Sequence, residues 1–232
     1  MKSYHQYIYP NVLLTDNSVS FNGKICSLQL DTGWRLGKGL VSPKRTNFWV
    51  EIPKNASNSM SEFLHYNRNW KDCNRIQRKV IDAQYHVILR DPADRWKKCI
   101  TEICNIYRQE RVHSRFDYWF KRQEFTNLYK YYDLHIVRQV DFLIGLNWHQ
   151  TNFYYLDDNL SENILKAFDD TGPFPTLNVT RMNKSKMRIL QMVEDLVTPD
   201  FELQLKEFYA LDYELISKVD FISYQTPELI NT

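Results

Sequence analysis

The chain has 232 residues, 43% of them hydrophobic, so it is long enough for one α/β domain with a core of its own. With a net charge of +2, the overall composition does not require nucleic acid or an anionic membrane as a partner. No apolar run reaches the length of a membrane span. Because the N-terminus carries no apolar segment of signal-peptide type and the four cysteines match no zinc spacing, we expect a cytoplasmic protein with reduced thiols and no bound metal.

Residues 1–44 contain turn signals between two short, weakly alternating runs, Val19–Phe21 and Lys24–Leu28. This pattern predicts a small N-terminal β meander that packs on the main domain, which we place at residues 45–232. A disordered arm is the alternative, and the aliphatic residues of this segment count against it.

The next segment has the order of a strand, a tight loop and a helix. The apolar, β-prone run Phe48–Ile52 stops at Pro53, and Lys54 with five small or amide residues follows before helical spacing begins at Met60. Such a loop directs backbone N–H groups, a lysine and hydroxyl groups to one spot, with the positive end of a helix dipole behind them. These are the parts of an anion-binding loop.

A second segment repeats this order. The strand Val87–Arg90 meets Asp91, which is a good N-cap, and Pro92, which suits the first position of a helix. The apolar residues that follow keep to one helical face, and Lys98 lies about two turns into the helix. Because the carboxyl ends of parallel strands open onto the same sheet edge, we expect both segments to bring phosphate-sized sites to that edge.

Together the two segments resemble the sulfotransferase family that uses 3′-phosphoadenosine 5′-phosphosulfate (PAPS), most closely its carbohydrate branch. Pro53–Ser59 fits the family's Pro-Lys-x-Gly/Ala-Ser/Thr-x-Ser/Thr loop, and Arg90–Lys98 fits Arg-Asp/Asn-Pro-x-x-Arg-x-x-Ser except that Lys98 replaces the serine. The resemblance covers about residues 45–218. It implies an α/β, P-loop-NTPase-like three-layer sandwich with a small central parallel sheet flanked by helices. It also implies transfer of a sulfuryl group from PAPS to a hydroxyl acceptor, with a carbohydrate as one candidate.

The resemblance further implies roles for individual residues. Lys54 would reach the oxygen that bridges sulfur and phosphorus, and the small-residue loop would hold the 5′-phosphate. Arg90 would hold the 3′-phosphate of PAPS, or of its product 3′-phosphoadenosine 5′-phosphate (PAP), through its planar fork. Lys98 would either add a point charge to that phosphate or point to solvent. The implied cofactor-binding residues are Lys54, Asn55, Ala56, Ser57, Asn58, Ser59, Arg90, Lys98, Arg181 and Lys184.

A base is expected to take the proton of the acceptor hydroxyl. Family members use histidine or glutamate at places that vary among branches. The candidates in this chain are Glu62, His65, His86 and His135, and we place His65 and His86 beside Lys54 as the catalytic residues. Any single histidine is more often structural than catalytic. The chemistry requires no metal, and no cluster of metal ligands is present in the sequence.

Later segments extend the resemblance. Leu134–Leu143 is similar to a His-x-x-x-Gln segment of the carbohydrate branch, with Arg138 where proline often precedes the glutamine, and Asn152–Leu156 predicts a third parallel strand. The family has an Asn- and basic-rich segment in the place of Thr176–Lys186, where it folds over the 3′-phosphate, and an exposed basic loop is the equal alternative. Phe208–Leu215 resembles the Tyr-x-x-Asp ending of the family's last helix, a structural feature.

Two other functions remain open. A non-catalytic sulfotransferase-like module that binds a nucleotide or an anionic glycan would account for Lys98 and for the unassigned base. A P-loop kinase is disfavoured, because Gly-x-x-x-x-Gly-Lys-Ser/Thr is absent and Lys54 precedes its loop instead of closing it. The expected partner is a hydroxyl-bearing small molecule or a glycan acceptor, with no nucleic acid and no membrane.

Overall fold

A short antiparallel sheet precedes the main body of the chain. The computed structural model describes residues 13–14, 18–21, 24–27, 37–74, 82–109, 135–143, 146–168 and 184–222. The strands β1 (Leu13–Leu14), β2 (Ser18–Phe21) and β3 (Lys24–Ser27) pair in that order, so the predicted meander is present. Its expected packing on the main domain stays a prediction.

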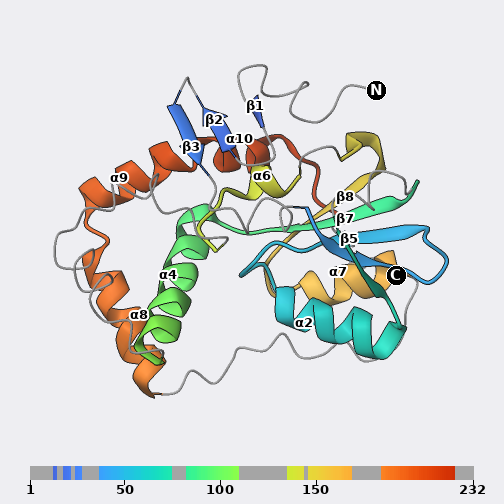
Figure 1. The fold of residues 1–232 in the computed structure, drawn as a ribbon, viewed down its shortest axis with the longest axis horizontal. Helices are drawn as coiled ribbons and strands as arrows, with labels where there is room; N and C mark the ends of the chain where they lie inside the picture. The colour runs from blue at the N-terminus through green and yellow to red at the C-terminus, as the bar shows by residue number, and fades with distance from the viewer. Residues whose placement is uncertain are drawn as a thin grey trace, which may run out of the picture.

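The main body is built on a five-stranded sheet (Figure 1). Its strands, in spatial order, are β6 (Lys71–Cys73), β4 (Gly39–Val41), β5 (Asn47–Val50), β7 (Gln84–Leu89) and β8 (Thr151–Tyr155). The neighbours β5, β7 and β8 run parallel, which confirms the third parallel strand. The expected parallel sheet is present only in part, however, because β4 pairs antiparallel with both β5 and β6 and makes the sheet mixed.

A tight turn explains why β4 joins the sheet in the antiparallel sense. The Ser42 hydroxyl oxygen accepts hydrogen bonds from the backbone N–H groups of Thr46, at 3.2 Å, and of Asn47, at 3.1 Å. Arg45 adopts a left-handed φ of 57° within the same turn. A short turn of this kind can join only antiparallel strands. Strand β4 therefore belongs to the central sheet although it lies before the boundary expected at residue 44.

Helical segments connect and flank these strands. Among the described residues they are α2 (Ser57–Ser61), η1 (Glu62–Tyr66), α4 (Pro92–Gln109), α6 (Gln139–Phe142), η3 (Trp148–Gln150), α7 (Leu160–Ala167), α8 (Lys184–Leu196), α9 (Pro199–Phe208) and α10 (Ala210–Lys218). None of these helices is both long and apolar enough to cross a lipid bilayer.

Alternation along the strands builds a separate core on each face of the sheet. Phe48, Val50 and Val87 belong to one buried cluster, which also contains side chains of α6 and α10. Trp49 and Ile88, one residue out of phase, belong to a second cluster, which contains side chains of α2, η1 and α7. Helices therefore cover both faces, as Figure 1 shows for α6 and α10 on one side and α2 and α7 on the other.

A third cluster packs away from the sheet, between helices that lie side by side in Figure 1. Trp96 of α4, Val193 of α8 and Leu205 of α9 are all buried there.

Candidate functional site

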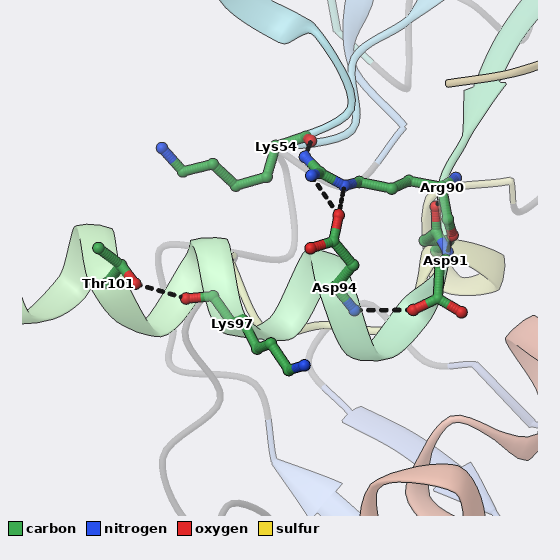
Figure 2. A network of polar contacts seen from close by, with 7 residues as sticks. Lys54, Arg90, Asp91, Asp94, Lys97 and Thr101 are labelled. Atoms are coloured by element: carbon green, nitrogen blue, oxygen red, sulfur yellow. Dashed lines mark hydrogen bonds and ion pairs between the residues drawn. The ribbon is translucent and has the colours of Figure 1, made fainter. Parts of the chain in front are cut away.

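The two strand-to-helix junctions predicted from the sequence lie against each other. Strands β5 and β7 are parallel neighbours, so their carboxyl ends meet at one edge of the sheet. There the Arg90 guanidinium donates a hydrogen bond from Nη1 to the Lys54 carbonyl oxygen, at 3.1 Å (Figure 2). The arginine of the second motif is therefore in direct contact with the loop of the first.

The loop between β5 and α2 turns through two left-handed residues. Lys54 has a φ of 68° and Ala56 a φ of 57°, and each such conformation costs a residue with a Cβ about 1 kcal/mol. The Asn55 N–H donates to the Ile52 carbonyl at 3.1 Å, and the Met60 N–H closes the first helical turn on the Ala56 carbonyl at 2.9 Å. The loop thus reverses direction sharply, and α2 begins immediately after it.

The loop's small side chains divide into an inward and an outward set. The Asn55 side chain is buried, and its amide nitrogen donates to the Ile88 carbonyl at 2.8 Å and to Gln139 Oε1 at 2.6 Å. Ser59 is also buried, whereas Ser57 is half-buried and Asn58 is exposed. The Asn55 amide therefore fixes the loop from below, whereas the side chains of Ser57 and Asn58 stay accessible to a ligand.

Gln139 is a site residue to which the sequence assigned no role. Its buried amide oxygen accepts hydrogen bonds from Asn55 Nδ2 at 2.6 Å and from the Arg90 N–H at 3.0 Å. Its amide nitrogen donates to the Arg90 carbonyl at 2.8 Å. One side chain therefore ties both motif junctions together. The glutamine of the His-x-x-x-Gln segment was the signal that could have identified it.

The Tyr-x-x-Asp ending holds Gln139 in place from the other side. The carboxylate of Asp212 accepts the backbone N–H groups of Gln139, at 2.9 Å, and Val140, at 3.0 Å, and so caps α6. The Tyr209 hydroxyl donates to the Ile136 carbonyl at 2.7 Å. Complete burial raises the pKa of the Asp212 carboxyl to about 6, although the two N–H groups act to lower it.

Arg95, the second arginine of the Arg-Asp-Pro-x-x-Arg motif, is entirely buried below the loop. It donates from Nε to the Pro53 carbonyl at 3.0 Å and from Nη1 to the Val137 carbonyl at 2.7 Å. Its charge also lies close enough to Asp212 to lower the pKa of that carboxyl. Arg95 therefore connects the loop, α4 and the segment before α6, a structural role.

The two cations of the site are each paired with a carboxylate. Arg90 Nε donates to Asp94 Oδ2 at 2.6 Å, and Asp94 lies in the first turn of α4, which Asp91 caps as predicted. Lys54 extends away from Arg90 in Figure 2, and its ammonium group lies 3.3 Å from Glu102 Oε2. Both cations are only partly exposed, at 24% for Lys54 and 20% for Arg90.

The remaining cations of the prediction lie around this pair or outside the described residues. Lys98 is half-buried on α4, and its side chain makes no hydrogen bond or ion pair within the described part of the chain. Arg181 lies outside the described residues, as does the side chain of Lys184, the first residue of α8. The structure instead brings Lys186 of α8 to Glu102, at 2.5 Å.

The two histidines placed in the catalytic set both make structural hydrogen bonds. The exposed His65 donates from Nδ1 to the Trp70 carbonyl at 2.9 Å. His86 is buried, with Nε2 at 3.0 Å from Asn47 Oδ1 and Nδ1 at 2.9 Å from the Tyr154 hydroxyl. Burial lowers the pKa of His86 to about 3, so the ring is neutral at physiological pH. The structure favours neither ring as the base.

At one sheet edge the chain therefore joins a lysine, an arginine and a small-residue loop, held from below by buried polar side chains. Comparisons with protein-family models, with curated proteins and with solved structures found no match to this chain.

Proposed function

We propose that this chain is a PAPS-dependent sulfotransferase that moves a sulfuryl group to a hydroxyl acceptor, with a carbohydrate hydroxyl as one candidate. The observation that carries the proposal is the contact between Arg90 and the Lys54 carbonyl, because it joins the two motifs on which the resemblance depends. Helices on both faces of a sheet with three parallel neighbours are compatible with the P-loop-like three-layer fold that the family would have.

The donor set suits a nucleotide with a charged group at each end. Arg90 offers a planar fork for one phosphate, and Lys54 with the N–H groups and hydroxyls of the loop offers donors for another. Both cations are already ion-paired, so a ligand has to replace Asp94 at Arg90 and Glu102 at Lys54. Partly exposed pairs of this kind contribute about 1 kcal/mol or less, which a dianionic phosphate exceeds.

Catalysis at this edge would consist of positioning and charge stabilisation. PAPS supplies the sulfuryl group when bound. Lys54 would neutralise the charge that develops on the oxygen leaving sulfur, and the rigid loop would keep that oxygen in line with the acceptor. Arg90 would fix the opposite end of the nucleotide, and Gln139 would keep the Lys54 loop and Arg90 at a constant separation.

A non-catalytic binding module is the second candidate. The observation in its favour is that His65 and His86 both have their hydrogen bonds directed to structural partners, so that no base is assigned. A module of this kind would bind PAP without transferring sulfate to any acceptor in a broad panel.

Transfer of radiolabelled sulfate from PAPS to a panel of sugar and phenol acceptors tests the proposal. We expect transfer by the wild type, none by Lys54→Ala, and unchanged transfer by Lys97→Ala. Lys97 is a half-buried lysine of the neighbouring helix α4, and the hydrogen bond from Thr101 to its backbone carbonyl survives the substitution. The Lys54→Ala variant should still bind PAP through Arg90 and the loop, but more weakly than the wild type, because the nucleotide loses one of its charged contacts. Full activity of Lys54→Ala would rule out the role of this lysine, and PAP binding by an inactive wild type would favour the binding module.

A further inference from the structure

Glu102 lies between two lysines that come from different parts of the chain. Its Oε2 atom is 3.3 Å from the ammonium group of Lys54, in the loop, and 2.5 Å from that of Lys186, on α8. All three side chains are partly exposed, at 24% for Lys54 and 22% for each of the others. The carboxylate therefore joins three segments at a place that solvent and a ligand can both reach.

The two lysines hold Glu102 ionised. Partial burial by itself would raise the pKa of the Glu102 carboxyl. The hydrogen bond from Lys186 and the charge of Lys54 together outweigh this effect, so the pKa lies below its ordinary value. One carboxylate is then shared by two cations, which leaves a local excess of one positive charge. An incoming anion is attracted to this excess.

The unequal distances indicate that Glu102 releases Lys54, and not Lys186, when an anion binds. Lys186 is the closer partner, and its Nζ donates a hydrogen bond to the carboxylate, whereas the ammonium group of Lys54 lies 0.8 Å farther away. If Lys186 were absent, Glu102 would have Lys54 as its one cation and would compete fully with a ligand for it.

We propose that Glu102 is a positioning residue that pairs with Lys54 while no ligand is bound. When the nucleotide binds, Glu102 stays paired with Lys186, and Lys54 leaves it to contact the sulfate or phosphate end of the nucleotide. This inference rests on the proposed function and adds two residues to the site that the motifs do not contain. Lys186 acts in it through Glu102 and does not contact the nucleotide.

Isothermal titration with PAP on four forms of the full chain tests the inference: wild type, Glu102→Gln, Lys186→Met and the double variant. Glu102→Gln should bind PAP about fivefold more tightly, because Lys54 no longer has to leave a carboxylate. Lys186→Met should bind PAP less tightly, because Glu102 then pairs with Lys54 alone. In the double variant the effect of Lys186→Met should vanish, because the group through which Lys186 acts has been removed.

The outcomes distinguish a failure of the inference alone from a failure of the function on which it rests. No PAP binding by the wild type overturns both. PAP binding that Glu102→Gln leaves unchanged or weakens overturns the inference alone. A loss of affinity from Lys186→Met that persists in the double variant also overturns it, because Lys186 would then contact the nucleotide directly. Glu202→Gln is the matched control, since it removes a carboxylate paired with Lys206 on α9 and should leave PAP affinity unchanged.

Discussion

Replacing Gln139 by leucine should destabilise the chain more than a typical substitution does. The change keeps the approximate volume of a fully buried side chain but removes its hydrogen bonds with Asn55 Nδ2, the Arg90 N–H and the Arg90 carbonyl. Each bond contributes about 1 kcal/mol, and a polar group left buried without a partner costs about 1–3 kcal/mol. Asn55 Nδ2 keeps its bond to the Ile88 carbonyl, so the groups of Arg90 bear most of the loss.

We therefore expect Gln139→Leu to lower the free energy of unfolding by roughly 3–5 kcal/mol. Urea unfolding followed by circular dichroism measures this as a lower midpoint with an unchanged slope. Gln191→Leu is the control, because Gln191 is exposed on α8 and its side chain donates to a neighbouring carboxylate, Asp195, at 2.9 Å. A loss below about 1 kcal/mol for Gln139→Leu would refute the claim that this amide fixes the two junctions.

Three smaller predictions concern single groups. Burial holds the pKa of His86 near 3, below its unfolded value, so its stability contribution is complete above pH 6.5 and falls by about 1.4 kcal/mol per pH unit below that. Urea titrations between pH 7 and 5 should show that His86→Gln removes this slope, and an unchanged slope would contradict the assignment. Ala56→Gly should stabilise the chain by about 0.5–1 kcal/mol, because Ala56 is left-handed, whereas Ala93→Gly in α4 should destabilise it by about as much. Tyr209→Phe should cost about 1 kcal/mol or more in urea unfolding, because the Ile136 carbonyl loses its donor; no loss would show that the bond is dispensable.

The sequence was sufficient for features that depend on neighbouring residues. The N-cap Asp91, the loop after β5 and the three parallel strands follow from local turn chemistry and from short apolar runs, and all are present. The antiparallel strand β4 was missed because it has three residues, too few to show an alternating pattern of apolar and polar side chains.

The polar framework of the site could not be read from the sequence in the same way. Gln139 meets Arg90 across 49 positions and Asp212 meets Gln139 across 73, and no local pattern encodes such contacts. The family-like segments marked Gln139 and Asp212 without revealing what they bind. Glu102 belongs to no motif at all, and only the packing of α8 against α4 brings Lys186 to it.

The most direct test of the account is a titration of PAP and of adenosine 5′-phosphate into the wild type and Arg90→Ala, with Lys97→Ala as control. If the Lys54 loop and Arg90 hold the two ends of one nucleotide, the wild type should prefer PAP by about tenfold or more. Arg90→Ala should lose most of that preference, and Lys97→Ala should keep it. Equal affinity of the wild type for the two nucleotides would contradict the account.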